Sequence, residues 1–169
     1  MKHPKSYETT PEVRKRMANV HLKKGLSEIS LAKALWHDGY RYRLNYRKLP
    51  GSPDIAILRY KIAVFVDGEF WHGYQWSERK KRLKANREYW IEKIEENKER
   101  DLRNDQRLLD IGWTPIHFWE KEVKKDLPGC IRTIESLSMQ VRIDALAERG
   151  PLDSTLGTGA PSAPWHIIE

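Results

Sequence analysis

Carboxylates and a histidine gather near the middle of this chain, at the ends of two apolar runs. Asp54 comes directly before the first run, and Asp67, Glu69 and His72 follow the second. Oxygen ligands suit Mg²⁺, which keeps several waters and needs only one or two carboxylates from a protein. A histidine, with an ordinary pKa of about 6.5, can take or give a proton at neutral pH. Together these residue types could hold a metal against a phosphodiester, polarise the phosphate and activate water.

Spacing alone leaves two interpretations of these residues open. In the chemical one, Asp54 and a main-chain carbonyl near Val66 hold the metal. Asp67 and Glu69 then add carboxylates, and His72 transfers the proton. In the structural one, the acids only close turns at strand ends, which is a common role for short acidic side chains.

Composition restricts the class of partner and of site. The 169 residues fit one domain, and 31 Lys and Arg against 24 Asp and Glu give a formal net charge of +7, which favours polyanions. No apolar run approaches the roughly 20 residues that span a bilayer, so we expect no membrane partner and a cytoplasmic location. Because Cys130 is the single cysteine, the sequence excludes a disulfide framework and a multi-cysteine zinc site.

Two strands are expected to position the acids. Residues 55–58 predict a buried strand, and residues 62–66, rich in β-branched and aromatic side chains, predict a second. The short polar turn between them indicates a hairpin. Alternation predicts a further strand over residues 40–44, and the proline within residues 113–119 predicts an edge strand. We interpret His117 in that last strand as a structural residue.

Helices are expected on either side of these strands. The residues around Pro11 predict a short basic helix that ends before Gly25, and Ser27 then caps a second helix. Glu28 lies in the first turn of that second helix, where the macrodipole alone favours an acid. Residues 76–87 are densely basic without apolar periodicity, which predicts a loop or an arm that contacts phosphates.

Periodic apolar residues predict two longer helices in the second half of the chain, from Glu88 to Gly112 and from Asp126 to Gly150. Their expected buried stripes include Ile94, Leu102, Leu108, Leu109, Ile131, Ile134 and Leu146. The resulting order of elements, α, α, β, β, β, α, β, α, predicts the α/β class.

The stretches LPGSPDI at residues 49–55 and FVDGEFWHG at residues 65–73 form a specific combination. With shorter matches further along, they resemble the very-short-patch-repair (Vsr-type) DNA mismatch endonucleases, a branch of the PD-(D/E)XK nuclease superfamily. The likeness covers about residues 10–137. It implies a restriction-endonuclease-like core, in which helices flank a mixed central β-sheet.

The resemblance implies roles for individual residues. Asp54 and the main-chain carbonyl of Val66 would bind Mg²⁺, with two ions at the site. His72 would be the general acid–base, Glu28 would be a supporting glutamate, and Asp67 remains a further catalytic candidate.

The resemblance also implies how the chain meets DNA. Phe70 and Trp71 would enter the base stack beside a mismatch, and Met17 would intercalate from the opposite groove. Phe70 and Trp71 could instead be core anchors beneath the hairpin, and the sequence leaves both interpretations open. The other expected DNA contacts are Arg14, Lys15, Arg16, Lys23, Lys24, Lys80, Lys81 and Arg82.

One position departs from the family pattern. Family members usually have Cys where this chain has Glu69, and they complete a structural zinc site with further Cys and His. Residues 73–76 and Lys121 supply no such ligands. We therefore expect no structural zinc and a neighbouring loop that is held by the packing of Tyr74 and Trp76. Glu69 could instead join the metal site.

The sequence therefore predicts a DNA endonuclease. Residues 1–25 would be a basic DNA-contacting segment, residues 26–150 the nuclease domain, and residues 151–169 a flexible tail. A monomer would nick one strand of double-stranded DNA at a T·G mismatch and leave 5′-phosphate and 3′-hydroxyl ends. Two alternatives remain: a sequence-specific restriction-type enzyme, which would need a dimer to cut both strands, and a non-catalytic DNA-binding module.

Overall fold

The computed structural model describes residues 11–83 and 86–148, and for residues 12–24 it describes the helical backbone but not the side chains. The elements are α1 (Pro11–His37), β1 (Arg43–Leu44), β2 (Ile55–Ile57), the 3₁₀ helix η1 (Leu58–Tyr60), β3 (Ile62–Asp67), α2 (Trp76–Arg82), α3 (Arg87–Asp110), β4 (Thr114–Trp119), α4 (Glu120–Lys125) and α5 (Leu127–Glu148). The protein is of the mixed α/β class, as its sequence predicts.

The strands form one mixed sheet in the order β1-β2-β3-β4. β2 pairs antiparallel with β1 and with β3, which confirms the predicted hairpin. β4 pairs with β3 in parallel over its whole length and lies at the edge of the sheet. Pro115 in β4 lacks an N–H, and an edge strand tolerates that loss.

The two faces of the sheet carry different side chains because successive residues of a strand point to opposite sides. One face, here called the α1/α5 face, presents Ile55, Ile57, Ile62, Val64 and Val66 to Leu31 and Leu35 of α1, Val123 of α4 and Ile131 and Ile134 of α5. The other, the α3 face, presents Ala56, Ala63 and Phe65 to Leu108 of α3 and to Leu49. Most of the apolar core therefore lies on the α1/α5 face.

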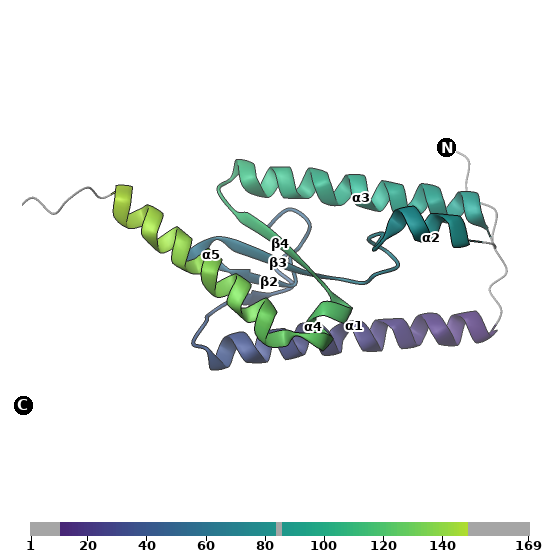
Figure 1. The fold of residues 1–169 in the computed structure, drawn as a ribbon, viewed down its shortest axis with the longest axis horizontal. Helices are drawn as coiled ribbons and strands as arrows, with labels where there is room; N and C mark the ends of the chain where they lie inside the picture. Colours follow the sequence, from purple (N-terminus) through teal and green to yellow (C-terminus); the bar gives the residue numbers. More distant parts are fainter. Residues whose placement is uncertain (1–10, 84–85, 149–169) are drawn as a thin grey trace, which may run out of the picture.

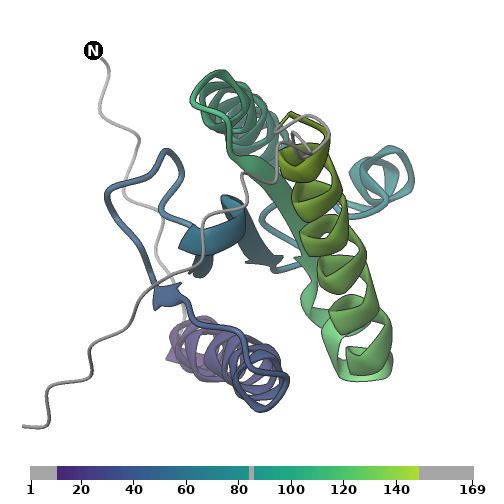
Figure 2. The same cartoon turned by 90° about the vertical axis from the view of Figure 1, so that its left-hand side faces the viewer.

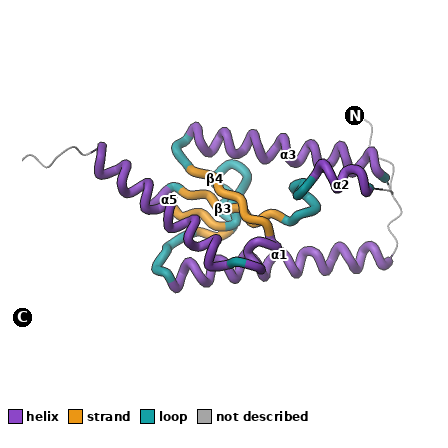
Figure 3. The backbone as a smooth tube through the Cα atoms, viewed as in Figure 1, coloured by secondary structure: helices purple, strands orange, loops and turns teal. Residues whose placement is uncertain are grey.

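α3 and α1 lie on opposite sides of the strands, as Figures 1 and 2 show, and α5 runs diagonally across the sheet. The first halves of α1 and α3 extend past the strands in one direction, and α2 lies beside α3 at that end (Figures 1 and 3). The loop that leaves β3 leads toward this end. None of the helices in the described residues is long and apolar enough to span a membrane.

Two predictions for the basic stretches are wrong. The expected break before Gly25 does not occur, because α1 runs without interruption from Pro11 to His37. Residues 76–82 form the helix α2 instead of a loop. α2 lacks an apolar stripe but is anchored on α3, where Glu95 accepts from Trp76 Nε1 at 3.4 Å and pairs with Lys80 at 2.6 Å.

The long helices and the edge strand occur where they are predicted, but parts of their stripes are not buried. Ile94, Leu108, Ile131 and Ile134 are buried as expected, whereas Leu102, Leu109 and Leu146 are exposed. Cys130 is buried in α5, as expected. The sequence did not predict α4, which begins where the N–H of Trp119 donates to Glu122 Oε2 at 3.2 Å. β1 is shorter than the predicted strand over residues 40–44.

Candidate active site

Strand alternation brings Asp54, Asp67 and His117 together on the α3 face. Asp54 stands two residues before Ala56, and Asp67 stands two residues after Phe65, so both acids share the face of those core residues. His117 is the register partner of Phe65 on β4. Two carboxylates and an imidazole therefore lie on the side of the sheet that α3 covers.

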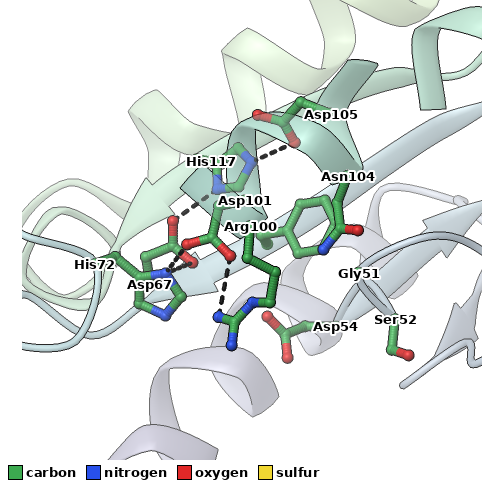
Figure 4. A pocket seen from close by; sticks show the side chains of 11 residues that line it. Gly51, Ser52, Asp54, Asp67, His72, Arg100, Asp101, Asn104, Asp105 and His117 are labelled. Carbon is green, nitrogen blue, oxygen red and sulfur yellow. Dashed lines mark hydrogen bonds and ion pairs between the residues drawn. The ribbon is translucent and has the colours of Figure 1, made fainter. Parts of the chain in front are cut away.

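α3 supplies the opposite wall. Residues three or four apart on a helix share a face, and Ile94, Asn97, Asp101, Asp105 and Leu108 follow that spacing. Between the helix and the sheet lies a cavity of about 240 Å³. It is lined by Gly51, Ser52, Asp54, Phe65, Asp67, His72, Arg100, Asp101, Asn104, Asp105 and His117 (Figure 4).

Asp54 ties the start of β2 to the end of β3. Its Oδ2 accepts the N–H of Val66 at 2.7 Å. The N–H and C=O of a strand residue point to the same neighbouring strand, so the Val66 carbonyl lies on the Asp54 side as well. The Val66 side chain is fully buried on the α1/α5 face, and its main chain meets Asp54, which lines the cavity. A carboxylate and a main-chain carbonyl are therefore adjacent.

His72 reaches the cavity from the loop that follows β3. Its Nδ1 lies 2.7 Å from Asp101 Oδ2 and 3.6 Å from Asp67 Oδ1. An ionised carboxylate only accepts hydrogen bonds, so Nδ1 carries the proton. No residue in the described part of the chain bonds Nε2. Nε2 is the ring atom that can exchange a proton with a substrate or water.

Asp101 remains ionised beside His72. Burial opposes its ionisation, but the hydrogen bonds and charges of His72 and Arg100 outweigh burial and lower the pKa of the Asp101 carboxyl. Arg100 contacts Asp101 Oδ1 at 3.1 Å. Asp101 thus orients the His72 ring as a charged acceptor.

His117 lies between two acids. Its Nδ1 is 2.6 Å from Asp67 Oδ2, and its Nε2 is 3.0 Å from Asp105 Oδ1. The ring stacks on Phe65, with ring centroids 4.6 Å apart. Burial lowers the pKa of this imidazole, but the hydrogen bonds and charges of Asp67 and Asp105 prevail and raise it to about 9. His117 is therefore cationic at neutral pH.

The loop over residues 68–75 is fixed to α3 and to the start of α4. Asn97 Nδ2 donates to the Trp71 carbonyl at 3.2 Å, and Glu69 Oε1 accepts the Lys121 N–H at 2.9 Å. Tyr74 packs edge-on against Trp119 at 5.1 Å. Glu69 does not line the cavity, and its carboxylate instead bridges the loop to α4.

Gly73 permits this loop to approach α3 closely. Its φ of +72° belongs to the left-handed region, and a Cβ there would lie 3.0 Å from the Lys98 side chain and 3.3 Å from that of Ile94. A larger residue at this position would strain the backbone and push the loop away from the helix. The position of His72 therefore depends on a glycine next to it.

Phe70 and Trp71 pack with Trp90 of α3 in an aromatic cluster. Ring centroids are 5.2 Å apart for Phe70 and Trp71, 5.2 Å for Phe70 and Trp90, and 5.7 Å for Trp71 and Trp90. Phe70 nevertheless remains 37% exposed. The cluster lies outside the two buried cores of the sheet, so these rings do not anchor the hairpin.

The other residues that are predicted to contact DNA lie on α2 and α1. Lys80 pairs with Glu95, Lys81 pairs with Glu78 at 3.1 Å, and Arg82 borders a small apolar pocket beside Phe70. The side chains of Arg14, Lys15, Arg16, Met17, Lys23 and Lys24 lie outside the described residues, as do residues 1–10 and 149–169.

Glu28 is half-buried and does not line the cavity. It stands far inside the continuous helix α1, so the explanation of this acid as a helix-start carboxylate is wrong. Leu31 and Leu35, three and seven residues later, are fully buried, which places Glu28 on the inward side of α1.

Several residues of the cavity were not predicted from the sequence: Arg100, Asp101, Asn104, Asp105 and His117. Asp101 and Asp105 share one face of α3 with Asn97 and Leu108, and a search for polar residues at helical spacing could have found these two acids. His117, interpreted as structural, could have been found only by pairing β4 with β3, which places it beside Phe65.

This chain is similar in sequence to known DNA endonucleases. A family model described as DNA mismatch endonuclease Vsr matches residues 7–78. The type II nicking enzyme V.NmeDIP of Neisseria meningitidis serogroup C is 46% identical over 126 residues, which are 74% of this chain and 85% of that protein. The chain belongs to the Vsr family of DNA endonucleases.

Other Vsr-family relatives agree with this assignment. The type II nicking enzyme V.HpaIIP of Haemophilus parainfluenzae is 48% identical over 119 residues, 69% of this chain and 84% of that protein. The DNA mismatch endonuclease Vsr of Escherichia coli strain K12 is 38% identical over 94 residues, 55% of this chain and 59% of that protein. As a Vsr-family protein, this chain is a DNA nicking endonuclease with a restriction-endonuclease-like core.

Proposed function

We propose that this endonuclease uses Mg²⁺ to nick one strand of duplex DNA at a T·G mismatch, leaving 5′-phosphate and 3′-hydroxyl ends. The observation that carries the proposal is the cavity on the α3 face, where Asp54 and His72 lie beside a loop that exposes Phe70. The names of relatives, which include nicking enzymes and a mismatch endonuclease, support the same activity.

Asp54 and the Val66 carbonyl are the proposed metal ligands. Both are oxygen donors, as Mg²⁺ prefers, and they are adjacent across the 2.7 Å bond from Val66 N–H to Asp54. The described residues contain no group of three or more His, Cys, Asp or Glu that could hold a metal by themselves. Mg²⁺ needs no such group, because it binds through one or two carboxylates, substrate phosphates and water. Asp54 and DNA phosphate could together ligate the two ions that the sequence resemblance implies. Bound Mg²⁺ would polarise the phosphate.

His72 is the proposed general acid–base. Asp101 holds its Nδ1 proton, and Nε2 is the atom that takes a proton from water or gives one to the leaving oxygen. Glu28, on the inward side of α1, is proposed as a supporting carboxylate. Asp67 is proposed to act through the His72 ring, from which its Oδ1 lies 3.6 Å.

Phe70 and Trp71 are the proposed mismatch wedge. Exposed aromatic side chains can enter a base step and unstack it, most easily where pairing is already weak. Trp90 contacts both rings edge-on, and Phe70 stays 37% exposed. Met17 is proposed to enter from the opposite groove.

The basic residues are proposed to bind the DNA backbone. Lys80, Lys81 and Arg82 stand on α2, at the end of the molecule toward which the first half of α1 also extends (Figure 1). Residues 1–25, with Arg14, Lys15, Arg16, Lys23 and Lys24, are proposed to contact phosphates as well. Nicking one strand needs only one active site, so we propose a monomer. We place it in the cytoplasm with its DNA substrate.

A duplex panel tests this function. Purified protein would be incubated with end-labelled duplexes that contain a T·G mismatch, another mismatch or only matched pairs, each with Mg²⁺ or with EDTA. We expect a nick in one strand of the T·G duplex in Mg²⁺ alone, with a product end that ligase can seal. Equal cleavage of matched duplex, in both strands, would contradict mismatch nicking and favour the restriction-type alternative. Binding without cleavage would favour the non-catalytic one.

A further inference from the structure

His117 can act on the reaction only through a neighbour. Its Nδ1 faces Asp67 Oδ2 at 2.6 Å, and its Nε2 faces Asp105 Oδ1 at 3.0 Å. Since a carboxylate only accepts hydrogen bonds, both nitrogens carry protons and both are engaged. The face of the ring is stacked on Phe65. No ring nitrogen remains that could exchange a proton with DNA or with water.

Asp67 is the neighbour that connects His117 to the catalytic ring. It is 6% exposed and ends β3, directly before Gly68. Its Oδ2 bonds His117, while its Oδ1 lies 3.6 Å from Nδ1 of His72. One buried carboxylate therefore stands between two histidines, with one oxygen bonded to His117 and the other facing His72 (Figure 4).

We propose that His117 is a positioning residue: with Asp105 behind it, His117 turns the Asp67 carboxylate toward His72 and thereby fixes the orientation of the His72 ring. The proposal rests on the proposed role of His72 in proton transfer. Without His117, the Asp67 side chain is free to rotate, and Asp101 alone holds the ring. Outer hydrogen-bond partners of metal-ligating histidines typically change activity by about 10–100-fold, and we expect a loss of similar size here.

Two amide substitutions separate positioning from a general structural role. The amide nitrogen of asparagine falls close to the place of Nδ1, so His117→Asn keeps the bond to Asp67. The longer side chain of glutamine places its amide near the position of Nε2, so His117→Gln keeps the bond to Asp105 only. Both variants remove the imidazolium and its contact with Phe65, so each is the matched control of the other.

The experiment measures single-turnover nicking of a T·G duplex, DNA affinity, urea unfolding and the ¹⁵N-labelled imidazole signals of His72. We expect His117→Asn to nick within about threefold of the unsubstituted protein and His117→Gln to be about 10–100-fold slower, with equal DNA affinity. The His72 signals should move in His117→Gln and stay in place in His117→Asn. Equal nicking rates in the two variants, or unmoved His72 signals in His117→Gln, would overturn the proposal. An unsubstituted protein that does not nick would refute the proposed function, and the imidazole signals would still decide the role of His117.

Discussion

The two faces of the sheet use the same strands for different purposes. On the α1/α5 face, Ile57, Val64 and Val66 are buried among aliphatic side chains of the helices. On the α3 face, Asp54, Asp67 and His117 line a polar cavity. Val66 and Asp67 are neighbours in sequence, and strand alternation alone sends them to opposite faces. This fold thus separates stability from chemistry: substitutions on the α1/α5 face should unfold the protein, and substitutions on the α3 face should impair nicking.

An acid on the α1/α5 face is expected to have the largest effect. Val64 is fully buried in the aliphatic layer, and the carboxylate of Val64→Asp would lose its water without gaining a cation. An unpaired buried charge costs several kcal/mol, on the order of the whole stability of a small domain. We expect loss of the folded state in far-UV circular dichroism and urea unfolding. An unchanged urea midpoint would show that the α1/α5 face does not hold the fold together.

Removal of His72 should abolish chemistry and spare the fold. General acid–base residues typically contribute about 10²–10⁴-fold to a rate, and we expect a loss of that size in single-turnover nicking by His72→Ala. DNA affinity should change little, because phosphate contacts come from other residues. His37→Ala is the control, since His37 is exposed at the end of α1. Normal nicking by His72→Ala would remove this residue from the mechanism.

Loss of the Asp101 charge should have a smaller effect on the same face. Asp101→Asn keeps a side chain of the same shape but removes the negative charge that holds the His72 Nδ1 proton at 2.7 Å. We expect nicking to slow by about 10–100-fold with unchanged DNA affinity. The matched control is Asp110→Asn, because Asp110 is an exposed acid on the same helix and bonds Gln106. An equal loss in both variants would indicate a general effect of charge.

The smallest expected effect is a pH dependence of stability that comes from His117 on the α3 face. His117 has a folded-state pKa of about 9, above its ordinary value of 6.5. Its contribution to stability is therefore complete below pH 6.5 and is lost as the pH rises through about 9. Urea unfolding between pH 6 and pH 10 should show a decline in the unsubstituted protein that is reduced in His117→Asn. Parallel curves for the two proteins would show that the imidazolium does not contribute.

The apolar elements of the fold could largely be predicted from the sequence. The β2–β3 hairpin and the buried Ile131 and Ile134 follow from local patterns of apolar residues, and the edge position of β4 follows from its proline. These patterns are strong because burial on the α1/α5 face demands them. The continuity of α1 and the helix α2 were not predicted, because α2 depends on contacts with α3 and not on an apolar stripe of its own.

The polar residues of the cavity on the α3 face could be predicted only in part. Asp54 and His72 were found through a motif, and the structure places both in one cavity. Asp101 and Asp105 were missed because the inward face of α3 is polar there, so Leu102 and Leu109 were assigned to the buried stripe although they point to solvent. His117 requires the parallel pairing of β4 with β3, which joins residues far apart in sequence. A local pattern does not contain that information.

The most direct test of a metal-dependent nicking site on the α3 face is a Mg²⁺ titration of the unsubstituted protein and of Asp54→Asn. Both would be assayed by single-turnover nicking of one end-labelled T·G duplex, with DNA affinity measured in parallel. We expect the unsubstituted protein to nick faster as Mg²⁺ rises until the rate saturates. Asp54→Asn should bind the duplex with similar affinity and stay at the level of the uncatalysed control at every Mg²⁺ concentration. Nicking by Asp54→Asn at the rate of the unsubstituted protein would contradict a metal-dependent site at Asp54.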